Sequence, residues 1–122
     1  MSSLRGTGHP TKQLADTKNA QRRVDVNTIL NAIYQYAIDN NGSLPTAIST
    51  GRIEICKTGQ TCTGLLDLTV LTNSQKYIVS MPFDPVGATK SGAGYFASKS
   101  ANGRVTVDAP YAENSANITI TR

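Results

Sequence analysis

Between residues 13 and 39, apolar side chains recur at steps of three and four, which is the spacing of one face of an α-helix. Most positions between them are polar, and Asp25 is expected on the opposite face. Gly42 can adopt a left-handed cap and Pro45 prevents simple continuation, so we predict that the helix ends near residue 40. Its buried face is expected to consist of Val26, Ile29, Leu30, Ile33 and Ala37.

Beyond Pro45 the pattern changes to the two-residue alternation of β-strands. Residues 52–56, 104–109 and 118–121 alternate polar and apolar side chains, and residues 94–98 offer a further strand. An Asn-Gly pair precedes the run at 104–109, which is a hairpin signal. The apolar residues between 65 and 71 predict a short helix or a packed loop.

One long helix followed by a small sheet predicts an α+β fold, in which the helix covers one face of an antiparallel sheet. A chain of 122 residues supports a single domain. We assign residues 1–12, which are polar and lack a hydrophobic period, to an appended segment or a disordered tail, with a native functional arm as the alternative. The globular domain then spans 13–122, with the helix over about 13–40, a connection over about 41–90 and the sheet over about 91–122.

Positive charge is concentrated near the N-terminus. The chain has 12 Lys and Arg against 8 Asp and Glu, a net charge of +4. Residues 1–23 hold five basic residues and one acidic residue, whereas residues 24–122 hold seven of each. The body of the domain is therefore neutral, and its composition gives no support for a nucleic-acid-binding groove, so we do not expect nucleic acid as a partner.

The basic residues of segment 18–23 lie where the dipole of a helix starting there favours negative charge. Such turns are explicable if they were originally interior to a longer helix. We therefore expect the chain to be part of a longer protein whose helix continues towards the N-terminus. The sequence itself contains neither a signal-peptide pattern nor a run of about 18 to 20 apolar residues.

The two cysteines, Cys56 and Cys62, are separated by five residues. Two thiolates without a neighbouring His or further Cys cannot complete a tetrahedral zinc shell, so the spacing favours a disulfide. The alternative is a pair of free buried thiols. A disulfide persists outside a reducing cytosol, and the pair therefore suggests an exported protein.

Catalytic equipment is sparse. The only histidine, His9, lies in the segment assigned to the tail, so the folded body lacks the base of a Ser-His-Asp or Cys-His arrangement. No phosphate-binding glycine loop of the Walker type occurs. We expect no catalytic residues, no cofactor and no metal site, and a protein that is not an enzyme.

Residues 16–45 resemble the end of the N-terminal helix of type IV pilins and type II secretion pseudopilins. The resemblance rests on the polar-to-apolar segment 20–29, on residues 34–38, and on an N-G-x-x-P exit from Asn41 to Pro45. A second segment, Met81-Pro82-Phe83-Asp84-Pro85-Val86-Gly87 ahead of Gly94-Tyr95, is similar to the P-x-D-P-W-G … Y region of major pseudopilins, with Val86 in place of the tryptophan.

This resemblance implies a pilin-like fold and a structural role. The chain would be a subunit of a type IV pilus or pseudopilus that polymerises through its N-terminal helix into an extracellular or periplasmic filament. Its partners would be copies of itself, other pilins, the inner-membrane assembly machinery, and the cytoplasmic membrane through an N-terminal helix that anchors the precursor before assembly at the cell surface. The alternative is a minor pilin that acts as an adhesive or DNA-binding tip.

Two details of this chain depart from the family pattern. In major pseudopilins a nearby loop can bind calcium, but only Asp84 matches that loop here, and Asp84 could instead cap a turn between its two flanking prolines. The usual pilin disulfide pins a C-terminal loop, whereas Cys56 and Cys62 both follow soon after the helix.

Overall fold

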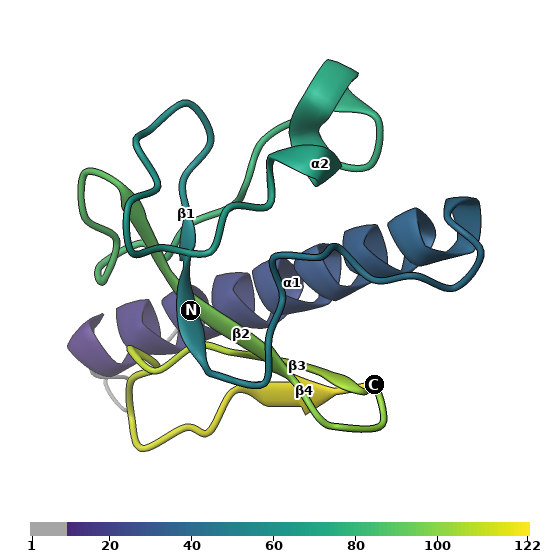
Figure 1. The fold of residues 1–122 in the computed structure, drawn as a ribbon. Coiled ribbons are helices and arrows are strands. Elements are labelled where there is room, and N and C mark those ends of the chain that lie inside the picture. Colours follow the sequence, from purple (N-terminus) through teal and green to yellow (C-terminus); the bar gives the residue numbers. More distant parts are fainter. Residues whose placement is uncertain (1–9) are drawn as a thin grey trace.

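Helix α1 (Pro10–Asp39) runs the length of the molecule, and a sheet packs against one of its faces (Figure 1). The computed structural model describes residues 10–122, so residues 1–9 of the predicted tail lie outside the described residues. α1 begins three residues before the predicted start at residue 13. It ends as predicted: Asn41 and Gly42 have φ angles of 58° and 84°, and the Gly42 amide donates to the Ala37 carbonyl at 2.7 Å.

The sheet has four antiparallel strands in the order β1-β2-β3-β4, which confirms the α+β fold. The strands are β1 (Ile53–Cys56), β2 (Gly92–Lys99), β3 (Val105–Asp108) and β4 (Thr119–Thr121). Each overlaps a segment that was predicted to form a strand. The sheet nevertheless begins earlier than residue 91, because β1 lies within the segment assigned to the connection and pairs with β2.

Between β1 and β2 the chain forms a short helical segment and several turns. α2 (Thr69–Thr72) is followed directly by the 3-10 helix η2 (Asn73–Gln75). Leu71 on α2 is fully buried, and Leu66 bridges to Ile55 of β1. The apolar residues of this region therefore form a packed cover over one edge of the core.

The core lies between α1 and the sheet. The five residues predicted for the buried face of α1 are all buried, four of them with no exposed surface and Ala37 with 6%. They are covered by alternating side chains of the sheet and by the segment around α2. The fully buried partners include Ile48, Ile55, Leu71, Tyr95, Val105 and Val107.

Two isoleucines on α1 provide a matched test of this packing. Ile33→Ala is expected to lower the free energy of unfolding by about 2 to 5 kcal/mol, because it leaves a cavity in the core. Ile38→Ala, at a position that is 70% exposed, is expected to change it by less than about 0.5 kcal/mol. Urea unfolding followed by circular dichroism measures both, and equal effects would contradict the packing described here.

Candidate functional site

The N-terminal half of α1 is held to the rest of the molecule by a buried arginine. The Arg22 side chain has no exposed surface. Its Nε and NH2 donate to the two carboxylate oxygens of Asp84, at 2.7 and 3.0 Å, and the Asp84 side chain is fully buried too. Its NH1 donates to Glu113 Oε2 at 2.7 Å and to Asn19 Oδ1 at 2.9 Å. Arg22 therefore joins α1 to two distant loops.

Asn19 fixes the second of these loops, which connects β3 to β4. Its Nδ2 donates to the Glu113 carbonyl at 2.7 Å, and its Oδ1 accepts the Glu113 amide at 2.9 Å. One turn earlier, Asp16 Oδ1 accepts Asn114 Nδ2 at 2.8 Å. The loop thus pairs with the helix through backbone and side chain together, as a strand would pair with its neighbour.

Asp84 organises the first loop, between η2 and β2. Its Oδ1 accepts the backbone amides of Val86 and Gly87, both at 2.8 Å, so Asp84 does cap a turn between its prolines. Gly94 of β2 is required at this point, because its φ is +80° and a Cβ there would lie 2.8 Å from the Asp84 Cβ. With its two oxygens engaged by a guanidinium and two amides, Asp84 is not arranged as a calcium ligand.

A second buried carboxylate corrects one expectation. Asp25, predicted on the outward face of α1, is only 5% exposed. Its Oδ2 accepts the Tyr95 hydroxyl at 2.6 Å, and its Oδ1 accepts Gln21 Nε2 at 2.6 Å. Burial, followed by the hydrogen bond to Asp25, raises the pKa of the Tyr95 hydroxyl far above its ordinary value. The hydroxyl therefore remains protonated and acts only as a donor.

Arg22 and Asp84 are both charged in the folded protein, because the hydrogen bonds between them stabilise the two charged forms. Burial alone would raise the pKa of Asp84, but hydrogen bonds from Arg22, Gly87 and Val86 outweigh it, and the net pKa is lowered. The hydrogen bond to Asp84 raises the pKa of Arg22 still further above its ordinary value. Among the described residues, every buried side-chain nitrogen and oxygen has a partner. The hydrogen-bonding groups of the cluster are all used within the fold. The cluster therefore stabilises the structure and offers no free acid, base or nucleophile.

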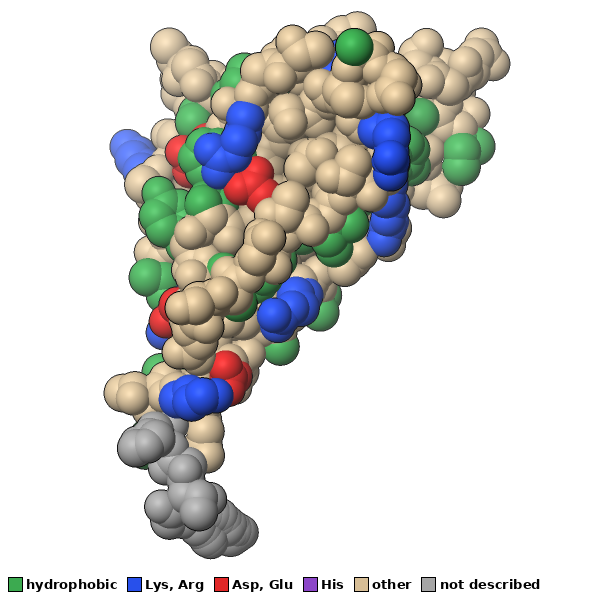
Figure 2. Space-filling model, turned by 90° about the horizontal axis from the view of Figure 1, so that it is seen from below, with side chains coloured by type: hydrophobic (Ala, Val, Ile, Leu, Met, Phe, Trp, Pro, Cys, Tyr) green, Lys and Arg blue, Asp and Glu red, His purple; other side chains and the backbone are tan. Residues whose placement is uncertain are grey.

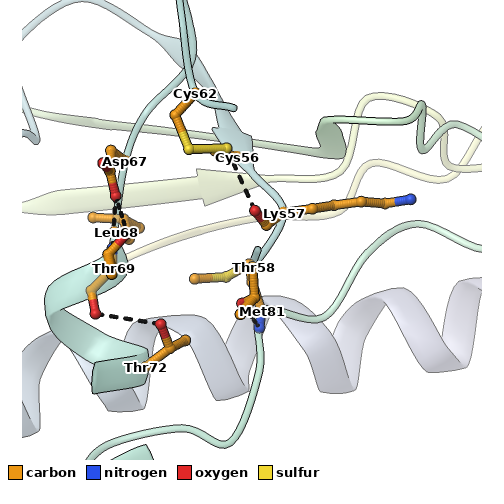
Figure 3. Close-up of a pocket in the computed structure, with 9 residues that line it drawn as sticks. All are labelled: Cys56, Lys57, Thr58, Cys62, Asp67, Leu68, Thr69, Thr72 and Met81. Atoms are coloured by element: carbon orange, nitrogen blue, oxygen red, sulfur yellow. Dashed lines mark hydrogen bonds between the residues drawn. A yellow bond between two sulfur atoms is a disulfide. The ribbon is translucent and has the colours of Figure 1, made fainter. Parts of the chain in front are cut away.

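The disulfide pairs Cys56 with Cys62, as the spacing predicts, and closes the loop that follows β1. Figure 3 shows it beside Asp67, Thr69 and Met81, which line a small hollow under α2. That hollow has a volume of about 10 Å³, enough for a single water molecule and for no larger ligand. Within residues 10–122 no three His, Cys, Asp or Glu side chains gather as a metal site would require.

The outward face of α1 is uncharged over most of its length. Between Lys12 and Asp39, the exposed positions farthest from the sheet carry no charge, and Val24 and Ile38 are 59% and 70% exposed. Arg122 approaches from the flank and donates to Asn27 and Asn31 at 2.7 Å. The residues of this outward stripe are Gln13, Thr17, Ala20, Val24, Thr28, Asn31, Gln35 and Ile38.

Comparisons with known proteins identify no relative: no family model, no curated protein and no solved structure matches this chain. In the part of the chain that the structure describes, no helix has the length and apolar character needed to cross a bilayer.

Of the residues singled out from the sequence, Cys56 and Cys62 come together, and the five apolar residues on α1 share one buried face. Sequence reasoning missed Arg22, Asn19 and Glu113. Arg22 stands in a basic segment that is typical of solvated surface, and its partners follow 62 and 91 residues later. The one sequence feature that could have indicated this cluster is Asp84, which lies between two prolines.

Arg22→Ala is expected to lower the free energy of unfolding by about 3 to 5 kcal/mol, because the buried Asp84 carboxylate is then left without a cation. Arg52→Ala is the matched control, since the Arg52 side chain is 50% exposed in its pair with Asp108 and should cost about 1 kcal/mol. Denaturant unfolding of both variants measures the difference. Similar losses in the two variants would show that Arg22 is no more than a surface charge.

The lowered pKa of Asp84 predicts a specific acid response. Its ion pair stabilises the fold fully above the ordinary carboxyl pKa of 3.8, and this contribution is lost as the pH falls below 3.8 through the lowered pKa. We therefore expect the free energy of unfolding to fall steeply below about pH 4. Asp84→Asn should have a lower stability at neutral pH and a shallower acid limb. Parallel acid limbs in urea titrations between about pH 2 and 7 would contradict this assignment.

Proposed function

We propose that this chain is a structural subunit of a type IV pilus or pseudopilus, which polymerises through α1 into a filament at the cell surface or in the periplasm. A single long helix on a four-stranded antiparallel sheet, with a disulfide, is compatible with a pilin-like fold. The observation that carries the proposal is the division of α1 into one face bound to its own domain and an opposite face that carries no charged side chain of its own and is bound only where Arg122 reaches Asn31.

The outward stripe is suited to contact with another helix. It includes small side chains at Thr17, Ala20 and Thr28, which allow close approach, and apolar ones at Val24 and Ile38. From Gln13 to Ile38 it covers about 37 Å of helix, at about 1.5 Å per residue. Packing of such ridges into the grooves of a neighbouring helix needs no charged partner. An ordinary solvent-facing stripe of this length would carry Lys and Glu.

The geometry also favours an open polymer over a closed dimer. Only one face of α1 is covered by its own sheet (Figure 1), and the outward stripe extends over nearly the whole helix. Contacts made at successive levels along such a rod are heterologous, and repeated heterologous contacts generate a helical filament. Copies of this chain are thus the main partners in the proposal.

Other parts of the proposal follow from the same role. Other pilins would share the filament, the inner-membrane assembly machinery would add subunits, and an N-terminal continuation of α1 would anchor the precursor in the cytoplasmic membrane. The disulfide fits an exported domain. In this proposal the chain is not an enzyme, because the buried polar groups of the described residues serve one another.

The alternative of a DNA-binding tip has weaker support. On the face shown in Figure 2, most Lys and Arg side chains stand apart from one another, separated by uncharged surface. Arg52 is paired with Asp108 and Lys76 lies 3.9 Å from Asp39, which removes two cations from a continuous phosphate-binding track. A filament subunit accounts for the structure without a dedicated nucleic-acid site.

A charge placed in the middle of the outward stripe tests the proposal. In cells that make the protein, Val24→Asp is expected to reduce sheared surface filaments at least about tenfold, because each copy would bury an unpaired carboxylate at the helix contact. Val79→Asp, at a loop position that is 66% exposed, is the matched control. Immunogold labelling and shear fractions provide the measurement.

Thermal unfolding of both purified variants should match that of the native domain, because both positions are exposed. Native protein that never leaves the cytoplasm, or filaments that persist in Val24→Asp with native yield, would overturn the proposed function.

A further inference from the structure

Three exposed apolar side chains lie on the two loops that Arg22 holds. Phe83, Val86 and Tyr111 are 53%, 58% and 47% exposed. The Tyr111 ring lies over Gly87, where an added Cβ would be 2.2 Å from the ring, so it adjoins Val86. The Lys57 ammonium lies 4.3 Å from the centre of the Phe83 ring. We call the group Lys57, Phe83, Val86, Lys90 and Tyr111 the loop patch.

The two loops that carry the apolar side chains of the loop patch are anchored by buried hydrogen bonds. Phe83 and Val86 flank Asp84, whose carboxylate is bound by Arg22 and by two backbone amides. Tyr111 lies two residues before Glu113, which is bound by Arg22 and Asn19. The backbone segments that carry these three side chains are therefore anchored by buried hydrogen bonds.

The charge beside these side chains is positive and unpaired. The Lys57 amide donates to the Ser91 carbonyl at 2.7 Å, which places exposed Lys90 close by. Neither lysine has a carboxylate within ion-pair distance among residues 10–122. All eight carboxylates of the chain, by contrast, accept a hydrogen bond from a donor of the chain itself. The ammonium groups of Lys57 and Lys90 are therefore available to an external anion.

From this arrangement we infer that the loop patch binds the surface of an anionic lipid bilayer. Apolar loop tips bordered by lysines are suited to the boundary between acyl chains and charged headgroups, where the aromatic and aliphatic side chains lose water and the ammonium groups meet phosphate. A nucleic acid would satisfy Lys57 and Lys90 but would leave Val86 in water. The loop before β2 and the loop between β3 and β4 lie at the end of the molecule that holds the N-terminal half of α1 (Figure 1).

This inference goes beyond the proposed function and does not depend on it, because the chain in hand suffices for the contact. Its test is flotation of the purified chain with vesicles of phosphatidylcholine alone or containing about one third phosphatidylglycerol. Binding is expected only with phosphatidylglycerol, and it should weaken at least about tenfold when NaCl is raised from about 20 to 200 mM.

Two paired substitutions separate the apolar and charged contributions. Phe83→Ser with Val86→Ser, and separately Lys57→Gln with Lys90→Gln, should each weaken vesicle binding about tenfold or more. Val79→Ser and Arg104→Gln are the matched controls, since both residues are exposed, lie outside the patch and make no ion pair among the described residues. Both controls should bind as the native chain does.

Circular dichroism verifies that each variant folds. If the variant with two serine substitutions does not fold, the variant with two glutamine substitutions alone tests vesicle binding. Failure of the native chain to bind anionic vesicles would overturn the inference, as would native affinity in either patch variant. Retention of a DNA duplex without vesicle binding would overturn it as well and point to nucleic acid. Because the outward stripe is intact in the patch variants, normal filaments without vesicle binding would leave the proposed function standing.

Discussion

The buried ion pair of Arg22 and Asp84 is the interaction on which the rest of the structure depends. Taking both charges out of water is costly, and such a pair persists only when its remaining hydrogen-bonding groups are satisfied. Here the guanidinium also reaches Glu113 and Asn19, while Asp84 accepts two backbone amides. The polar side chains at this point thus hold one helix and two loops in a single arrangement.

The Arg22–Asp84 ion pair belongs to the first of two halves of α1, and different forces hold these two halves to the rest of the molecule. From Val26 onward the helix contacts the sheet through apolar side chains with almost no exposed surface. Before Val26 it is held by polar side chains: Asn19 and Arg22 bind loops, and Asp25 accepts the hydroxyl of Tyr95 on β2. Hydrophobic packing tolerates small shifts, whereas a bidentate ion pair fixes orientation. The direction of the helix relative to the sheet is therefore set chiefly by its polar half.

The parts of the fold that follow from local pattern could be predicted, and the parts that depend on long-range pairing could not. The helix end at Gly42, the alternating strands and the disulfide rest on short-range geometry. Asp25 was expected on the outward face, because charged side chains are rarely buried without partners and nothing local reveals its partner Tyr95. The two carboxylates that pair with Arg22 lie 62 and 91 residues further along the chain and are equally hidden from local pattern. Pairing of β1 with β2 spans the α2 region and leaves no local signal.

The ionic tie also explains how one small domain can present two different surfaces. If α1 is the element that joins neighbouring subunits, its outward stripe must stay free of the sheet, and the strong inner contacts ensure that the domain moves with the helix. The same contacts anchor the two loops that carry the exposed side chains of Phe83, Val86 and Tyr111. Without Arg22, these loops would lose their shared anchor, because Arg22 binds Asp84 in one and Glu113 in the other. The ion pair thus keeps both surfaces available while the core itself is complete.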